Sequence, residues 1–263
     1  MTSGGKAIGT VIHPLPDAVA EGFAMGDRTV LVLGGGVGGV AAANLVKEKL
    51  GDRVRVRLVE RKRQSQFPPS YPWIMLGLRT ASAVQRDLGA LKAKGIDVVR
   101  GEVTSIDTQA KSVQTTKGDL SYDDLIIALG AEYAPEAVPG FAEHAHHIYD
   151  LDSALRFKEA IESFPGGTIA VGVARLPFKC PAAPYEVALL LDDHYRRKGL
   201  RERVNFEFFT PEGAPVPATG PEIGAQVAGL LAARGINYRP KRKLLEIAPH
   251  ELRFEGGETV PYD

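Results

Sequence analysis

The sequence has only one cysteine, Cys180, among its 263 residues. A single thiol cannot form a disulfide within these residues, which excludes a disulfide-stabilised scaffold of the kind common in small secreted proteins. A lone cysteine is typical of a protein in a reducing compartment, or of one that uses a thiol chemically.

Net charge and long apolar runs are also absent. The 32 Lys and Arg residues balance the 32 Asp and Glu residues, so nothing in the overall charge indicates a nucleic-acid partner. No apolar run reaches the roughly 20 residues that a transmembrane helix needs. Residues 1–27 contain no continuous apolar stretch like that of a signal peptide, and we predict a flexible leader there. The sequence thus predicts a location in the cytoplasm or at the periphery of a membrane.

A glycine-rich turn follows the four apolar residues 30–33, which indicate a buried strand. Gly34, Gly36 and Gly39 have the G-x-G-x-x-G spacing of a dinucleotide-binding turn. In that motif one glycine allows the tight turn, one lets the backbone approach a pyrophosphate, and one lets helix and strand pack closely. The small residues that follow predict a helix to about Leu50, with its N-terminus facing the phosphates.

A second predicted strand, residues 54–59, ends in an acid that strengthens this interpretation. Glu60 occupies the position where a dinucleotide-binding fold has the carboxylate that bonds the ribose hydroxyls. A carboxylate there disfavours a 2′-phosphate, so the sequence predicts FAD or NAD as the ligand rather than NADP. The alternative is an ordinary glycine-rich turn, which the combination of strand, helix and acid disfavours.

Further elements complete the first predicted domain. Three prolines within residues 66–73 predict an irregular loop near the ligand. Ser82 is expected to begin a helix that runs to Lys94 and ends at Gly95. The remaining predicted strands are 96–99, an antiparallel pair within 102–115, and the apolar segment 125–129, which ends at Gly130.

A second strand–turn–helix unit follows a Pro- and Ala-rich crossing at 132–147. Its first strand is predicted at 168–173, but no glycine turn comes after it, and Thr210-Pro211 replaces the acid expected after the strand at 204–209. Both halves of an NAD site are therefore missing from the sequence pattern. The crossing also contains three histidines whose H-x-H-H spacing predicts an exposed turn rather than a metal site: His144, His146 and His147.

Together these patterns predict an α/β fold with two Rossmann-like domains of the FAD/NAD(P)-binding type, each with a parallel sheet. The first carries an antiparallel β insertion. We expect residues 28–140 to form an FAD-binding domain and residues 141–263 a second Rossmann-like domain that carries Cys180. Residues 255–263 resemble the hairpin before a buried strand, so we expect the C-terminal part of the fold to be missing.

Cys180 lies between Lys179 and a helix expected to begin at Pro184. The helix dipole and the neighbouring cation both favour a thiolate, which is how a nucleophilic cysteine is prepared. A buried structural cysteine is the alternative. Glu186, in the first turn of that helix, is either a proton carrier near the thiolate or an acid that only stabilises the helix.

The glycine turn, Glu60, the strand 125–129 and the second unit together resemble the pyridine nucleotide-disulfide oxidoreductases. Within that superfamily, Phe67-Pro68-Pro69 and the Cys-Pro-x-x-Pro-Tyr-Glu stretch from Cys180 to Glu186 resemble sulfide:quinone oxidoreductases and the flavoprotein subunit of flavocytochrome c sulfide dehydrogenases. The resemblance covers residues 28–263. It implies a flavoprotein that takes electrons from sulfide, or a small thiol, and passes them through FAD to a quinone or a cytochrome.

The resemblance also implies roles for individual residues. FAD is expected to bind non-covalently, with its pyrophosphate at the three glycines and its adenosine ribose at Glu60. Arg61 and Val103 match positions that line the adenine in the family, and the strand end at 128–130 is expected near the dinucleotide. The positions expected to bind the cofactor are Gly34, Gly36, Gly39, Glu60, Arg61, Val103, Ala128 and Gly130.

In the resembling enzymes a pair of cysteines takes sulfide as a persulfide or trisulfide. Cys180 matches the first, and its partner is expected beyond Asp263, together with a region that meets quinone and the membrane. These residues alone are expected to be inactive. Two alternatives remain open: a flavoprotein like the NADH:quinone oxidoreductases, which needs a glycine-rich second turn, and a degenerate nucleotide-binding module without catalysis.

Overall fold

The computed structural model of the protein describes residues 28–263, and the predicted leader at 1–27 lies outside them. The chain forms two compact units. Of the described residues, the first contains 28–65 and Asp87–Gly130, and the second contains Gln66–Arg86 and Ala131–Asp263. The segment 66–86 therefore belongs to the second unit, although the residues on both sides of it in the sequence belong to the first. The expected extents of the two binding domains, 28–140 and 141–263, remain predictions.

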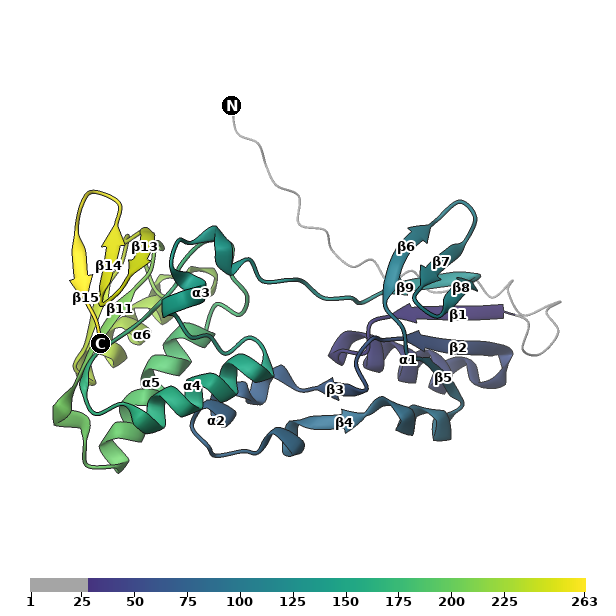
Figure 1. The fold of residues 1–263 in the computed structure, drawn as a ribbon, viewed down its shortest axis with the longest axis horizontal. Helices are drawn as coiled ribbons and strands as arrows, with labels where there is room; N and C mark the ends of the chain where they lie inside the picture. The colour runs from purple at the N-terminus through teal and green to yellow at the C-terminus, as the bar shows by residue number, and fades with distance from the viewer. Residues whose placement is uncertain (1–27) are drawn as a thin grey trace. The chain divides into compact units, whose positions relative to one another are not determined.

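A four-stranded parallel sheet forms the centre of the first unit (Figure 1). Its strands, in spatial order, are β5 (Ile96–Val99), β2 (Val54–Val59), β1 (Arg28–Leu33) and β9 (Asp124–Ile127). The helix α1 (Val37–Leu50) follows the glycine turn after β1. The predicted parallel strands and the predicted helix are thus confirmed, with β9 ending two residues early.

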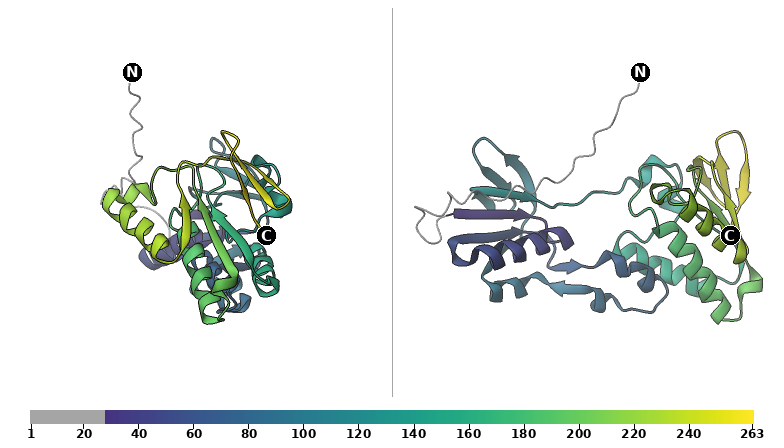
Figure 2. Two further views of the ribbon diagram at one scale, coloured as in Figure 1. Left: turned by 90° about the vertical axis from the view of Figure 1, so that its left-hand side faces the viewer. Right: turned by 180° about the vertical axis from the view of Figure 1, so that it is seen from behind.

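The side chains of β1 alternate between two layers. Val30 and Val32 are buried with Ala43 of α1 on one face, whereas Leu31 and Leu33 are buried on the other. The second layer is an antiparallel sheet, which Figure 2 shows on the opposite side of the parallel sheet from α1. Its strands are β6 (Val103–Asp107), β7 (Ser112–Thr115) and β8 (Gly118–Ser121). This layer is the predicted antiparallel insertion, extended by β8.

The segment after β2 differs from the predicted irregular loop. β3 (Gln64–Gln66) pairs with β4 (Gln85–Asp87), and a 3₁₀ turn (Pro68–Ser70) and the short helix α2 (Tyr71–Met75) lie between them. Pro72 is compatible with a helix because it lies in the first turn of α2, where a backbone N–H has no helical partner.

The helix predicted from Ser82 to Lys94 is wrong. Its place is taken by a 3₁₀ turn (Ala81–Val84), β4 and a second 3₁₀ segment (Leu88–Lys94). Asp87 explains the break, because its backbone is extended and its carboxylate accepts a hydrogen bond from the N–H of Gly89. The apolar residues that indicated a helical face are nevertheless all buried: Val84, Leu88 and Leu91.

A three-stranded parallel sheet forms the centre of the second unit, in the order β10 (Gly167–Gly172), β11 (Val204–Phe209) and β12 (Ile236–Arg239). Besides α2, the second unit contains the helices α3 (Phe141–His144), α4 (Leu151–Ser163), α5 (Ala183–Arg197) and α6 (Pro221–Ala233). An antiparallel sheet comprises β13 (Leu244–Ala248), β14 (Glu251–Phe254) and β15 (Thr259–Pro261). The predicted α/β fold class with two Rossmann-like parallel sheets is confirmed. No helix within residues 28–263 has the length and apolar character needed to cross a membrane.

The side chains of β11 also alternate between two layers. Phe206 and Phe208 are buried in an apolar cluster with Leu191 of α5. Phe209 points to the other face, where its ring meets that of Phe254 edge-on, with ring centres 5.3 Å apart. The parallel sheet of the second unit is therefore also held between helices and an antiparallel sheet.

The two units share one detail of hydrogen bonding, which we call the Tyr–Asp clamp. In the first unit the Asp123 carboxylate accepts a hydrogen bond from the N–H of Thr29, and the N–H of Asp123 donates to the Thr29 carbonyl. Asp263 makes the same two hydrogen bonds with Thr168. The tyrosine before each aspartate donates its hydroxyl to a backbone carbonyl: Tyr122 to that of Asp107, and Tyr262 to that of Ala248.

A buried carboxylate ties α5 to its surroundings. Asp192 is fully buried and accepts hydrogen bonds from Arg196, Arg201 and Arg234. Burial alone would raise the pKa of Asp192, but the three guanidinium groups hold it below its ordinary value of 3.8. Asp192→Ala is expected to lower the free energy of unfolding in urea by about 2–4 kcal/mol, because three cations lose their partner.

This contribution is complete above the unfolded pKa near 3.8 and is lost as the pH falls through the lowered folded value. Asp193→Ala is the matched control, because Asp193 pairs with Arg197 where both side chains are solvent-exposed. That change should cost less than about 0.5 kcal/mol. Equal losses in the two variants would contradict the assigned role of Asp192.

Candidate functional site

The glycines of the turn between β1 and α1 have different roles. A Cβ on Gly34 would lie 2.2 Å from the carbonyl oxygen of Ala128, and one on Gly39 would lie 1.8 Å from the carbonyl oxygen of Gly34. Gly34 also has a φ of +105°, which favours glycine. The packing of β1, α1 and β9 therefore requires these two glycines whether or not a ligand binds.

Gly36 is different, because nothing lies within 4 Å of an added Cβ and its φ is −73°. The fold of the unit gives no reason for a glycine at this position. A close approach by a ligand would give one, since the second glycine of the motif lets a pyrophosphate come near the backbone.

The N-terminus of α1 is open to an anion. Gly36, Val37 and Gly38 are exposed, the first turn has no acidic residue, and no side chain caps the helix. The first N–H groups of a helix lack helical partners and carry partial positive charge. This end of α1 therefore suits a pyrophosphate.

Glu60 follows β2 and contacts the turn. Its carboxylate accepts hydrogen bonds from the N–H of Gly35 at 2.7 Å and from the N–H of Lys62 at 2.8 Å. Glu60 thus holds the glycine turn in place, a role that the sequence pattern does not predict. Each carboxylate oxygen can accept more than one hydrogen bond, so Glu60 can still accept hydrogen bonds from a ribose. That contact stays a prediction.

The other predicted cofactor positions also lie at the carboxyl ends of the parallel strands. Arg61 donates to Glu102 at 3.1 Å, and Val103 begins β6 after the end of β5. Ala128 donates its N–H to the Leu33 carbonyl, and Gly130 follows with a φ of +81°. Folds of this type bind ligands at this edge of the sheet, but contact of these residues with a cofactor remains a prediction.

The corresponding turn of the second unit is built differently. Residues 173–182 contain no glycine, and α5 has Glu186 in its first turn. Thr210 follows β11 and is buried, and its hydroxyl lies 3.3 Å from the carboxylate of Glu212. An acid is therefore close to the end of β11, two residues later than the motif requires.

Cys180 is exposed and lies between β10 and α5. Its φ of +57° is unfavourable for a residue with a side chain, and such residues concentrate at functional sites. The Cys180 carbonyl accepts a hydrogen bond from the N–H of Ala183 at 3.0 Å, so the thiol precedes α5 by one turn. The exposure argues against a buried structural cysteine. Glu186 is also exposed, and its role as a proton carrier stays a prediction.

Lys179 makes a contact that sequence patterns alone do not predict. Its ammonium donates to the hydroxyl of Tyr133 at 3.0 Å and lies 5.5 Å from the centre of that ring. The Tyr133 hydroxyl in turn donates to the carbonyl of Tyr149 at 2.9 Å, and the two rings stack with centres 5.6 Å apart. Tyr133 lies within the Pro- and Ala-rich crossing and Tyr149 lies two residues after it, and no sequence motif links either of them to Lys179.

The histidines of the crossing contribute to the start of α4. Asp150 caps this helix by accepting from the N–H of Ser153, and Nε2 of His147 lies 3.2 Å from the Ser153 hydroxyl. His144 and His146 are exposed, as predicted, whereas His147 is half-buried, and burial lowers the pKa of His147. Residues 28–263 contain no group of three side chains of the types that bind metals in a suitable arrangement.

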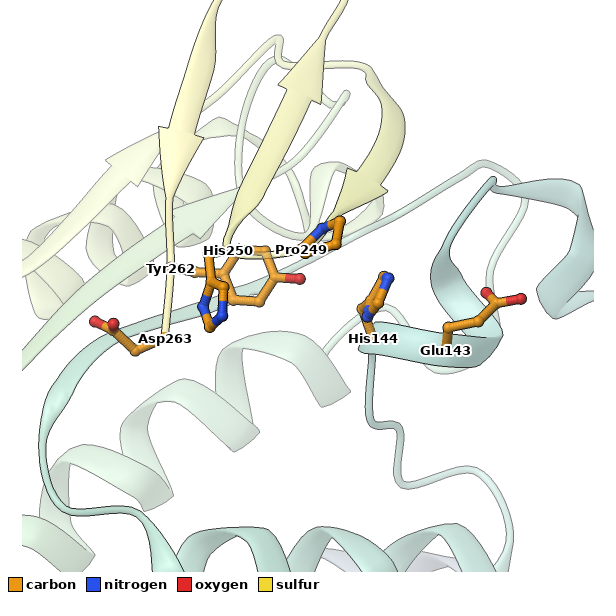
Figure 3. Close-up of a pocket in the computed structure, with 6 residues that line it drawn as sticks. All are labelled: Glu143, His144, Pro249, His250, Tyr262 and Asp263. Carbon is orange, nitrogen blue, oxygen red and sulfur yellow. The ribbon is translucent and has the colours of Figure 1, made fainter.

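A pocket of about 360 Å³ lies in the second unit between α3 and the antiparallel sheet β13–β15 (Figure 3). Its lining residues are Glu143, His144, Pro249, His250, Tyr262 and Asp263. None of the residues predicted to bind FAD or to react with sulfide lines this pocket.

A comparison with protein families and a comparison with curated proteins identify related oxidoreductases. Residues 28–263 match the family described as pyridine nucleotide-disulphide oxidoreductase. The mitochondrial sulfide:quinone oxidoreductase of Dictyostelium discoideum is 26% identical over 89% of this chain and 54% of its own length. The sulfide-quinone reductase of Aquifex aeolicus is 28% identical over 87% of this chain and 54% of its own length. The chain spans about half the length of the curated relatives it matches.

The solved structure of sulfide:quinone oxidoreductase from Aquifex aeolicus superimposes with a TM-score of 0.79 and 26% identity, over 89% of this chain and 56% of that one. The type II NADH:quinone oxidoreductase of Staphylococcus haemolyticus is 30% identical, but over only 51% of this chain and 34% of its own length. The predicted resemblance to sulfide:quinone oxidoreductases is confirmed.

The first unit fits the cofactor of these proteins. Proteins of the matched family and the sulfide:quinone oxidoreductases are FAD-binding flavoproteins. The open side of the turn at Gly36 and the uncapped N-terminus of α1 suit the pyrophosphate of FAD, and Glu60 is next to them. The match extends over residues 28–263, which is most of the sequence. The chain therefore belongs to the pyridine nucleotide-disulphide oxidoreductase family.

Proposed function

We propose that the full-length protein is an FAD-dependent oxidoreductase that oxidises sulfide, or a small thiol, at Cys180 and passes the electrons through FAD to a quinone or a cytochrome. The observation that carries this proposal is the exposed thiol of Cys180 on a left-handed backbone. Relatives named as sulfide:quinone oxidoreductases support the choice of donor and acceptor. Contact with a membrane surface through residues beyond Asp263 belongs to the same proposal.

The first unit holds the cofactor in this proposal. Gly34 and Gly39 keep the turn tight, Gly36 leaves room for the pyrophosphate, and Glu60 bonds the adenosine ribose while holding the N–H of Gly35. Arg61, Val103, Ala128 and Gly130 complete the surroundings of the dinucleotide. Bound FAD supplies an acceptor for two electrons.

The reaction at Cys180 forms a sulfur–sulfur bond. The thiolate bonds to the sulfur of a hydrosulfide ion, whose S–H bond breaks. The products are a cysteine persulfide anion, one proton and two electrons, and the electrons go to the flavin. Glu186, exposed in the first turn of α5, is the candidate acceptor for the proton.

Anaerobic mixing with sulfide tests the proposal directly. The full-length protein with bound FAD should lose the absorbance of oxidised flavin within one turnover, and a quinone or a cytochrome should restore it. A flavin that stays oxidised in the presence of sulfide would contradict the proposal.

An NADH:quinone oxidoreductase is the second candidate, supported by the relative in Staphylococcus haemolyticus and by Glu212 near the end of β11. The absence of glycine from residues 173–182 opposes it. A nucleotide-binding module without catalysis is the candidate of another class. It predicts a Cys180 thiol that alkylates slowly near neutral pH, whereas an active-site thiol should alkylate rapidly.

NADH should therefore reduce the flavin of the full-length protein at least about 100-fold more slowly than sulfide does, because the second unit offers no pyrophosphate site. Stopped-flow mixing with NADH and with NADPH measures this, and sulfide added to the same sample is the positive control. Rapid loss of flavin absorbance with NADH would contradict this prediction and favour an NADH:quinone oxidoreductase.

A further inference from the structure

The side chain before Cys180 is fixed by a tyrosine far away in the sequence. The Lys179 ammonium and the Tyr133 hydroxyl are 3.0 Å apart and belong to residues separated by 46 positions. The Tyr133 hydroxyl uses its own proton to bond the Tyr149 carbonyl at 2.9 Å, which leaves its lone pairs for the ammonium. Both residues and Cys180 belong to the second unit.

Tyr149 supports the ring of Tyr133. Its ring stacks on that of Tyr133, with centres 5.6 Å apart. Burial raises the pKa of Tyr149 to about 12, and the negative charge of a Cys180 thiolate adds to this shift. Cys180 directly follows Lys179 in the chain, so the residue that carries the thiol adjoins the one whose ammonium bonds Tyr133.

We propose that Tyr133 holds the Lys179 ammonium beside Cys180, so that the site favours anionic sulfur donors such as hydrosulfide over neutral ones. This inference rests on the proposed function of Cys180. A lysine side chain that is not held averages over many rotamers, whereas one bonded to a rigid ring keeps its charge in one place. Across several ångströms of partly aqueous surroundings, one such charge changes the local concentration of a monovalent anion about three- to tenfold.

Two alkylating reagents distinguish an effect of the local charge at Cys180 from an effect of the accessibility of its thiol. Iodoacetate is an anion and iodoacetamide is neutral, so the ratio of their rates at Cys180 reports the local charge and cancels the intrinsic reactivity of the thiol. The ratio is measured in the full-length protein by mass spectrometry of the peptide that contains Cys180. Lys179→Met should lower it about three- to tenfold, Lys179→Arg should keep it within about twofold, and Tyr133→Phe should lower it about twofold. High salt should remove these differences.

Lys243→Met is the matched control for net charge, because Lys243 is an exposed lysine paired with Glu255. Tyr262→Phe is the control for loss of a tyrosine hydroxyl bonded to a backbone carbonyl. Neither should alter the ratio, and thermal unfolding of each variant checks that it is folded.

A ratio unchanged by Lys179→Met would overturn the inference. A ratio lowered by Lys179→Met but unchanged by Tyr133→Phe would overturn the role given to Tyr133. The proposed function fails by a different result, undiminished reduction of the flavin by sulfide in Cys180→Ser, so the two failures are distinguishable.

Discussion

Cys180→Ser is expected to abolish reduction of the flavin by sulfide in the full-length protein, with a loss of about 10³-fold or more. A serine hydroxyl is not ionised near neutral pH and cannot form a persulfide, so the sulfur of the donor has nothing to bond to. Anaerobic stopped-flow mixing with sulfide measures the rate at which the oxidised flavin disappears.

Folding and cofactor content should stay unchanged in this variant, because the replacement is nearly isosteric and Cys180 is exposed. Cys180→Gly is a second variant with the same loss of reaction, but it removes the cost of a left-handed residue with a side chain and should raise stability by about 1 kcal/mol. Undiminished flavin reduction in Cys180→Ser would leave the sulfide assignment resting on similarity of fold alone.

Gly36→Val is expected to lower the affinity of the full-length protein for FAD by about tenfold or more. The valine side chain would point into the open space where no protein atom lies within 4 Å, and would occupy the path of the pyrophosphate. The measurement is the ratio of flavin to protein after purification, together with a titration of FAD into the apoprotein.

Gly36→Asp separates loss of the ligand from loss of the fold. Gly36 is the N-cap of α1, where aspartate is a preferred residue, so the helix should be as stable as before. The added carboxylate repels a pyrophosphate, and FAD should be lost here too. Gly229→Val in the exposed part of α6, where an added Cβ also meets nothing, should keep its flavin. Full flavin content in both Gly36 variants would mean that the pyrophosphate binds elsewhere.

Elements with strong local signals were predictable from the sequence. β2 and β11 begin and end at the predicted residues because each is a short run of apolar or alternating residues with clear limits. α5 begins beside Pro184, where the missing N–H of a proline costs nothing. The segment 82–94 was mispredicted because the spacing of its apolar residues identifies buried positions but not the backbone that connects them. Asp87 makes its own hydrogen bond to Gly89 and ends the helical geometry there.

The site could be predicted only in part, for a similar reason. The glycine spacing located the turn, but the bond from Gly35 to Glu60 depends on how two strand ends meet in space. The contact between Lys179 and Tyr133 joins residues 46 positions apart, and no local pattern encodes it. A sequence motif thus identifies which residues can react, whereas their partners are set by the packing of distant segments.

The Tyr–Asp clamp has a consequence for the order in which the units fold. Thr29 and Asp123 are 94 positions apart, and Thr168 and Asp263 are 95 positions apart. Closing loops of this length carries an entropic cost that local contacts do not have, so the pairing of β1 with β2 should precede the clamp in the first unit, and that of β10 with β11 should precede it in the second. Each clamp is then added to a pair of strands that has already formed, and it joins the start of the first strand to an aspartate almost a hundred residues later.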